Sequence, residues 1–174
     1  LGIGIITTAA KQEKDDAGAI REAIRLMSTL NRAAGEAMCA VGVHAATDIT
    51  GFGLLGHLRN IVVASGCTAT VWLDRVPVID AALRYVREGI VPGGTHANWR
   101  FLGEHTTFAE GVDKEAQLVL SDAQTSGGML IAVEPGKLDQ LLDALRERGT
   151  PCADVIGRLD AGSAGRMQVV ARAP

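Results

Sequence analysis

The residues best suited to chemistry lie in the stretch ATDITGFGLLGHL, residues 46–58. A carboxylate, Asp48, precedes three glycines, Gly51, Gly53 and Gly56, that fit the pattern G-x-G-x-x-G. Such glycines let the backbone approach a phosphate closely, whereas a carboxylate repels a bare phosphate unless a cation lies between them. The stretch therefore fits either a dinucleotide-binding loop or a carboxylate that holds a metal ion over a phosphate.

The dinucleotide-binding interpretation has local support. A strand-like segment precedes the glycines, a helical pattern follows, and Asp74 ends the next strand, near the place where such proteins carry the acid that binds a ribose. The position of Asp48 argues against this interpretation, because its charge would repel the pyrophosphate. The C-terminal half of the chain also lacks further β-α units.

A magnesium site is the second interpretation. Mg²⁺ typically takes one or two protein carboxylates and completes its shell with phosphate oxygens and water. Asp48 would supply the carboxylate, Thr47 and Thr50 offer hydroxyls beside it, and Gly51 lets the backbone come near. A third interpretation needs no ligand, since Asp48 or Thr50 could simply cap the helix expected to begin near Phe52.

Two more stretches of small residues follow, PGGTHAN at 92–98 and SDAQTSGG at 121–128. Backbone amides in such loops can form concavities that bind anions, although the same residues also make ordinary turns. The histidines, in contrast, contain no H-x-x-x-H pair on one helix, so we expect no zinc site.

Hydrophobic periodicity and turn residues predict the elements that must position these stretches. Strands are expected at 2–8, 41–46, 68–73, 117–120 and 128–133, and the segments 153–159 and 166–171 could pair as a hairpin. Helices are expected after a cap at Asp15 or Asp16 (with Ile20, Ile24, Met27 and Leu30 on one face), over 32–41, from Phe52 to about Gly66, from Pro77 to Gly89, and over 135–148. A long loop is expected over 89–115. This order predicts an α+β or layered α/β fold, with helices packed on a mixed β-sheet.

Composition narrows the class of protein. The 174 residues suffice for a single domain with its own core, and hydrophobic residues make up 47% of them. A net charge of −3 and 3% aromatic residues argue against a nucleic-acid partner, and no apolar run has the length of a membrane span. Cys39, Cys67 and Cys152 are predicted to be free thiols, which fits the cytoplasm. The opening Leu-Gly-Ile-Gly, without Met or a signal peptide, suggests a piece of a longer protein.

Taken together and in this order, the three stretches resemble one family, selenophosphate synthetase, also called selenide, water dikinase. The resemblance rests on residues 46–58, on Pro92-Gly-Gly-Thr95 with Asn98, and on residues 122–128, and it spans nearly the whole chain. Two departures affect loop detail: Ala123 stands where the family usually has proline, and His96-Ala97 replaces a pair that often includes arginine.

The resemblance implies the fold of an aminoimidazole-ribonucleotide-synthetase C-terminal domain and a reaction of ATP, selenide and water to selenophosphate, AMP and phosphate. It implies Mg²⁺ and, in general, K⁺. It also implies that residues 1–174 are the C-terminal half of a two-domain enzyme, which is a homodimer when complete. By this resemblance Asp48 is the metal-binding residue, and the residues expected to line the nucleotide site are Thr47, Thr50, Gly51, Thr125, Ser126 and Gly127.

The family's catalytic Cys or selenocysteine and its lysine would lie upstream of Leu1, in the N-terminal ATP-binding domain. The chain alone is therefore expected to be inactive, with no catalytic residue of its own. Two alternatives stay open: the C-terminal domain of another ATP-dependent enzyme of the superfamily (acting on a purine precursor, thiamine phosphate or a hydrogenase-maturation substrate), and a non-catalytic dinucleotide-binding or scaffold domain.

Overall fold

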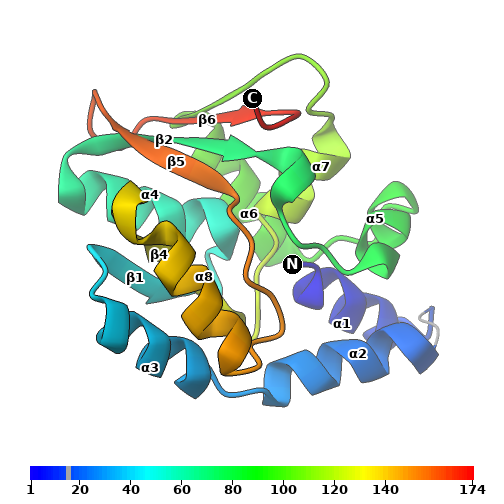
Figure 1. Cartoon of the computed structure of the whole chain (residues 1–174). Coiled ribbons are helices and arrows are strands. Elements are labelled where there is room, and N and C mark those ends of the chain that lie inside the picture. Colours follow the sequence, from blue (N-terminus) through cyan, green and yellow to red (C-terminus); the bar gives the residue numbers. More distant parts are fainter. Residues whose placement is uncertain (15–16) are drawn as a thin grey trace.

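Two separate β-sheets and the helices around them make up the computed structural model, which describes residues 1–14 and 17–174 (Figure 1). The helices are α1 (Ile3–Lys11), α2 (Ala17–Ser28), α3 (Arg32–Val41), α4 (Gly53–Ser65), α5 (Asp80–Arg87), α6 (Gly93–Gly103), α7 (Lys114–Leu120) and α8 (Leu138–Glu147). Short 3-10 turns lie at η1 (Leu73–Arg75) and η2 (Pro135–Lys137). The strands are β1 (Ala45–Asp48), β2 (Cys67–Trp72), β3 (Thr106–Phe108), β4 (Met129–Ala132), β5 (Gly157–Ala161) and β6 (Met167–Val170).

The larger sheet has four strands in the order β3-β6-β2-β5. β6 runs parallel to both β2 and β3, and β5 runs antiparallel to β2. The smaller sheet is an antiparallel pair of β1 and β4. The mixed sheet with packed helices is thus confirmed, but the predicted hairpin is wrong, because β2 lies between β5 and β6.

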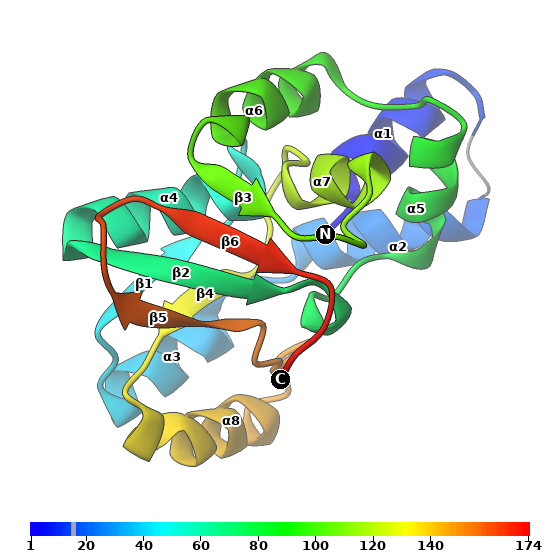
Figure 2. The ribbon, with the colours of Figure 1, turned by 90° about the horizontal axis from the view of Figure 1, so that it is seen from above.

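Figure 2 shows the larger sheet as a layer over α4 and over the smaller sheet. Alternation along β2 and β6 turns Val71 and Val169 inward, where they join Leu55 and Val62 of α4 in the main core. A second core joins α1, α2, α5 and α7 around Ile5, and a third fills the space where α3 meets α8. No helix in the described ranges is long and apolar enough to cross a bilayer.

Two segments predicted as strands are helices. Residues 2–8 lie mostly in α1, whose first amides are bonded by side chains more than 100 residues away in the chain. Residues 117–120 belong to α7, where the carboxylate of Asp113 accepts a hydrogen bond of 2.8 Å from the amide of Ala116. This is a helix N-cap. In both cases capping contacts outweigh the local composition, which is β-branched in residues 2–8 and apolar in residues 118–120.

The predicted loop 89–115 is largely ordered as α6 and β3. α5 begins at Asp80 and not at Pro77, because the amide of Ile79 donates to the carbonyl of Leu1 and keeps the preceding residues extended. β1 covers 45–48 instead of 41–46, since α3 continues to Val41 and Gly42 ends it with a φ of 76°. Asp48 is therefore a strand residue.

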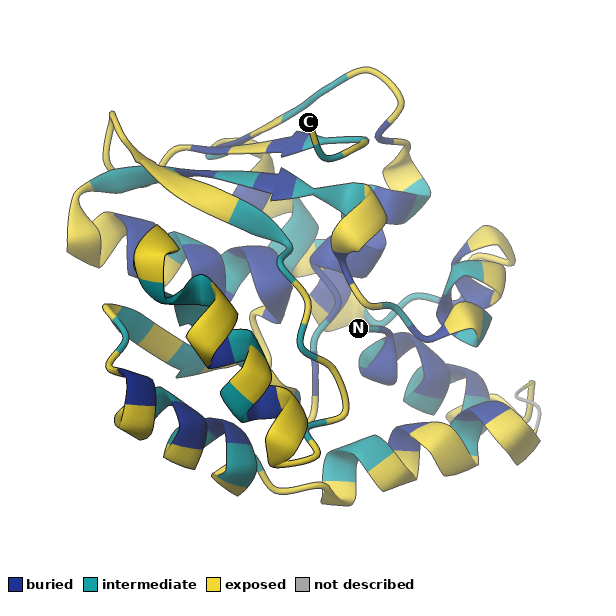
Figure 3. Ribbon diagram, viewed as in Figure 1, coloured by how far each residue is buried: buried dark blue, intermediate teal, exposed yellow. Residues whose placement is uncertain are grey.

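The predicted apolar face of α2 is only partly used. Its buried residues are Ala19 and Ala23, whereas Ile24 is 53% exposed. Leu30, which is 79% exposed, lies beyond the end of the helix at Ser28. Figure 3 colours much of this helix as exposed. The predicted cap at Asp15 or Asp16 falls outside the described residues. The remaining predicted helices, 32–41, 52–66 and 135–148, are confirmed as α3, α4 and η2 with α8.

Candidate functional site

Asp48 is the last residue of β1, and its side chain is exposed. It lies opposite Met129, the first residue of β4, so β1 ends and β4 begins at this edge of the small sheet. The neighbouring hydroxyl of Thr47 donates to the carbonyl of Asp48 over 3.1 Å. The carboxylate has no protein hydrogen bond or ion pair within the described part of the chain, which leaves its oxygens available to a ligand.

The loop 121–128 runs directly alongside the backbone that follows Asp48. The amide of Ile49 donates to the carbonyl of Gly128 (2.9 Å), that of Gly127 donates to Ile49 (3.0 Å), and that of Gln124 donates to Thr50 (3.0 Å). A Cβ at residue 127 would collide with the Ile49 carbonyl oxygen. Only glycine allows the two backbones to approach this closely.

The third stretch joins the same assembly through α6. The side-chain amide of Asn98 donates to the carbonyls of Gly51 (2.8 Å) and Ser121 (3.1 Å), and so connects the other two stretches. Gly53 adopts a φ of 68°, and a Cβ there would lie 2.7 Å from the carbonyl carbon of Ser121. All three small-residue stretches therefore meet in one hydrogen-bonded unit.

The helix-capping interpretation of Asp48 and Thr50 is wrong. α4 has Phe52 at its N-cap and no side-chain cap bond. Instead, the backbone amide of Thr50 donates to Nε2 of His57 (3.0 Å), and the Thr50 hydroxyl lies 3.0 Å from the same nitrogen. Because a backbone N–H can only donate, Nε2 of His57 is the acceptor of the bond from the Thr50 amide, and His57 thereby holds the loop in place.

A buried carboxylate supports the loop from behind. Asp122 accepts hydrogen bonds from the amides of Gly4 (3.0 Å) and Ile5 (3.3 Å), from the hydroxyl of Thr95 (2.8 Å) and from the side-chain amide of Gln124 (2.8 Å). Burial raises the pKa of Asp122 to about 6, and these hydrogen bonds oppose the rise. Gln124 in turn accepts from the amide of Ile3, so the two side chains together hold the N-terminus of α1.

The tip of the loop stays open. Thr125 and Ser126 are exposed, and Ser126 has a φ of 57°, in the left-handed region. The amides of Gln124 and Gly127 are used within the loop assembly, while those of Thr125 and Ser126 have no acceptor among the described residues. Exposed amides next to a left-handed residue are a common way to bind an anion.

The predicted site residues therefore fall into two groups. Asp48, Thr47, Thr50 and Gly51 lie on β1 and the residues after it, and Thr125, Ser126 and Gly127 lie on the adjoining loop. Within the described residues no group of three or more His, Cys, Asp or Glu side chains could hold a metal ion. An Mg²⁺ ion held by Asp48 would therefore need further ligands from phosphate, water or another domain.

A pocket of about 240 Å³ opens beside this unit, between α4 and α6. Phe101 and Arg59 both line this pocket, and the guanidinium carbon of Arg59 lies over the Phe101 ring, 5.2 Å from the ring centre. Its other walls are formed by Phe52, Gly56, Asn60, Asn98 and Leu102.

Sequence reasoning missed four side chains that shape the site: His57, Asp122, Gln124 and Asn31, whose amide donates to the carbonyl of Gly127 over 2.9 Å. Asp122 and Gln124 did carry a signal, because they lie between the apolar run 118–120 and the glycine pair 127–128. A polar residue at the end of such a run is often buried and bonded. Asn31 lies far away in sequence, and no sequence pattern indicated that it belongs to the site.

The dinucleotide-binding interpretation is wrong. It requires the strand before the glycines and the strand ending at Asp74 to be parallel neighbours in one sheet. β1 and β2 lie in different sheets, and the carboxylate of Asp74 accepts a hydrogen bond of 3.0 Å from the amide of Ala173.

Comparison with known proteins gives concordant results. Residues 1–170 match the family described as AIR synthase related protein, C-terminal domain. Two relatives carry the name selenide, water dikinase: one from Pelobacter propionicus, 43% identical over 159 residues (91% of this chain, 46% of the relative), and one from Myxococcus xanthus, 41% identical over 167 residues (95% and 47%). The chain spans about half the length of these relatives.

Solved structures of a hydrogenase maturation protein share the fold. E. coli HypE superimposes with a TM-score of 0.64 at 19% identity, over 97% of this chain and 43% of that one. HypE in complex with ATP gives a TM-score of 0.62 at 22% identity, over 98% and 44%. At these identities the likeness speaks for the fold alone. Since the family match covers all but the last residues, 171–174, the chain belongs to the AIR synthase related proteins as their C-terminal domain.

Proposed function

We propose that the chain is the C-terminal half of a selenide, water dikinase, which converts ATP, selenide and water into selenophosphate, AMP and phosphate. Relatives of that name, about 40% identical over most of the chain, support this assignment. The activity would belong to the complete protein, in which an N-terminal ATP-binding domain is the main partner and two copies form a dimer in the cytoplasm.

One observation carries the role of this half. The exposed carboxylate of Asp48 stands where the backbones of residues 49–51 and 124–128 meet, without a protein partner among the described residues. A carboxylate in this position would be a ligand for Mg²⁺ bound to the phosphates of ATP. When bound, Mg²⁺ neutralises charge that develops on phosphate oxygens during phosphoryl transfer, and K⁺ would be a further cofactor.

The surrounding residues of this chain would bind and orient. The amides of Thr125 and Ser126 have no acceptor among the described residues, so they and the exposed hydroxyls of the same two residues can donate to phosphate oxygens. The hydroxyls of Thr47 and Thr50 are bonded within the unit and would have to turn to do so. Gly51 keeps the backbone bare where the phosphates would approach, and Gly127 lets its loop pack against Ile49 so that the loop tip can take part in binding. Phosphoryl transfer depends mainly on such positioning and charge neutralisation.

A second candidate is another ATP-dependent enzyme of the same superfamily. The fold likeness to HypE in complex with ATP favours it. Both candidates use Asp48 and the same loops, and they differ in whether ATP cleavage depends on selenide.

The test is selenide-dependent release of AMP from Mg-ATP by the full-length protein, comparing wild type, Asp48→Asn and Asp154→Asn. Asp154 is likewise an exposed aspartate, but it lies outside the loop assembly, so its variant controls for loss of surface charge. We expect AMP from wild type and from Asp154→Asn, and at least a hundredfold less from Asp48→Asn. An unchanged rate in Asp48→Asn would remove the metal role, and ATP cleavage without selenide dependence would favour the second candidate.

A further inference from the structure

β5 is the outermost strand of the larger sheet, and one of its edges has no neighbouring strand within residues 1–14 and 17–174. Arg158, Leu159, Asp160 and Ala161 are all exposed, as the yellow stretch of this strand in Figure 3 shows. Unpaired edges are templates for another strand, and proteins usually cover, shorten or distort them. Charged residues can also blunt an edge, and β5 carries Arg158 and Asp160. No strand of the described residues pairs with its outer edge.

The backbone N–H and C=O groups of successive β5 residues point alternately toward β2 and toward the free edge. The amide of Trp72 donates to the carbonyl of Ile156, so Ile156 and every second residue after it (Arg158 and Asp160) point their backbone groups toward β2. The N–H and C=O groups of Gly157, Leu159 and Ala161 then point to the free edge. This set is symmetric about Leu159.

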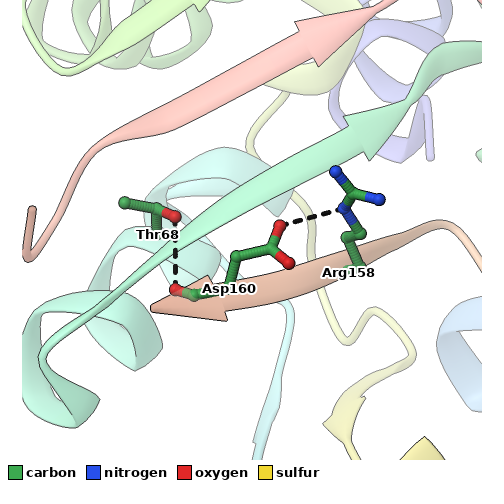
Figure 4. A network of polar contacts seen from close by, with 3 residues as sticks. All are labelled: Thr68, Arg158 and Asp160. Carbon is green, nitrogen blue, oxygen red and sulfur yellow. Dashed lines mark hydrogen bonds and ion pairs between the residues drawn. The ribbon is translucent and has the colours of Figure 1, made fainter. Parts of the chain in front are cut away.

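The charges on the strand follow the same symmetry. Arg158 and Asp160 stand on either side of Leu159, and Nε of Arg158 lies 2.9 Å from Oδ2 of Asp160 (Figure 4). The hydroxyl of Thr68 donates to the carbonyl of Asp160 and so ties the strand to β2 (Figure 4). If a second copy of β5 ran antiparallel and centred on Leu159, Arg158 of each copy would lie opposite Asp160 of the other.

We infer that β5 pairs with β5 of a second copy of this chain, antiparallel and in the register that places Leu159 opposite its own equivalent. In this register the outward backbone groups of Gly157, Leu159 and Ala161 bond those of the second copy. Arg158 of each copy then faces Asp160 of the other, and these two pairs of opposite charges stabilise the paired strands. Leu159, which is 38% exposed, is covered by its symmetry mate on the face it shares with Ala69.

Such an interface is closed and isologous, because the same patch serves both copies. It is also small, since one five-residue strand buries far less than the roughly 1,200–2,000 Å² of a stable complex. The dimer should therefore depend on concentration, and it should weaken as added salt screens the charge pairs. The inference is independent of the proposed function, since no residue of the Asp48 loops takes part.

The experiment is sedimentation velocity of this 174-residue chain over a concentration series up to about 1 mM at low salt. Wild type should shift from monomer to dimer. Arg158→Asp alone places two aspartates opposite each other, and Asp160→Arg alone places two arginines opposite each other, so each single variant should dimerise at least tenfold more weakly. The double variant with both changes restores opposite charges and should dimerise like wild type.

A mixture of the two single variants gives the decisive measurement. Arg158→Asp carries only negative charges at positions 158 and 160, and Asp160→Arg carries only positive charges there. Together they should form a heterodimer, although each alone stays monomeric. Loss of the ion pair within one chain cannot produce that rescue. Circular dichroism of each variant checks that it is folded.

Three results would overturn the inference. A wild type that stays monomeric throughout the series has no such interface. Single variants that dimerise like wild type place the interface elsewhere. Folded single variants that do not combine when mixed show that residues 158 and 160 do not face each other across two copies.

Discussion

The amide of Gly127 donates a 3.0 Å hydrogen bond to the carbonyl oxygen of Ile49, and that same oxygen occupies the space where a Cβ on residue 127 would lie. The contact holds the loop 121–128 against the residue that follows Asp48. Because the two backbones lie so close together, residue 127 has to be glycine. The tip of the same loop, Thr125 and Ser126, is exposed.

Gly127→Ala should therefore separate the two backbones. We expect it to lower the free energy of unfolding of this chain by about 2 kcal/mol, because the added methyl group meets backbone that cannot rotate away. Gly128→Ala is the matched control, since nothing lies within 4 Å of a Cβ at that position. Urea unfolding of both variants measures the difference, and equal stabilities would show that the loop adapts without cost.

The charge of Asp122 should make stability depend on pH. Its folded pKa of about 6 lies above the ordinary value of 3.8, so between these values the folded state binds more protons than the unfolded state. The contribution of Asp122 to stability is then largest below pH 4 and falls as pH rises to 6, by on the order of 3 kcal/mol.

Asp122→Asn isolates this effect. The amide oxygen can replace Oδ2, which accepts from three N–H groups, while the new NH₂ faces the Thr95 hydroxyl, which can turn to accept. Between pH 4 and 7 the difference in stability should move in favour of the variant. The Leu1 ammonium also faces Asp122, so the comparison is repeated on the N-acetylated chain. A constant difference across this range would contradict the raised pKa.

The start of α7 should depend on a single side chain. Asp113→Ala removes the hydrogen bond to the amide of Ala116 and should destabilise the chain by about 1 kcal/mol, as loss of an N-cap usually does. Asp113→Asn, which keeps a capping oxygen, should cost much less. Thermal unfolding of the two variants checks this, and equal midpoints would mean that the cap contributes nothing.

Asp48→Asn should leave the stability of this chain within about 0.5 kcal/mol of wild type, because an exposed carboxylate without a partner among the described residues holds no other group in place. Chemical denaturation measures it. A large loss would show that Asp48 has a structural task, and the lower activity expected of the full-length variant could then not be assigned to metal binding.

This 174-residue chain on its own should release no selenide-dependent AMP from Mg-ATP. The reason is that Asp48 is a lone carboxylate: the described residues contain no cluster able to hold a metal, and the proposed catalytic residues belong to the other half. The full-length protein in the same assay is the positive control. Turnover by the chain alone would place the whole active site within residues 1–174.

Local sequence patterns predicted those helices and strands whose own hydrophobic periodicity determines their structure. Leu141 and Leu145 repeat at helical spacing in α8, and β-branched residues alternate along β2, so both were predictable. α1 was not, because Ile3, Ile5 and Ile6 favour a strand by composition and become helical through the caps that Asp122 and Gln124 supply. A residue type cannot reveal a partner that lies so far along the chain.

The candidate site, too, could be predicted from the sequence only in part. The small residues of the three stretches indicated backbone packed closely against something, and the structure brings the stretches together. The partners of individual groups were out of reach: His57 as acceptor for Thr50, and Asn98 as the bridge between Gly51 and Ser121, depend on how α4 and α6 lie in space. Whether Asp48 and its neighbours bind Mg²⁺ and nucleotide stays a prediction.

The bonds from Gly4 and Ile5 to Asp122 also constrain the order in which the chain can fold. They join positions 118 and 117 residues apart, and the loop 121–128 completes the unit around residues 49–51. During synthesis the ribosome delivers α1 and β1 long before it delivers residues 121–128. The surface around Asp48 can therefore take its final shape only after most of this domain has been translated, and until then α1 lacks the side chains that hold its first turn.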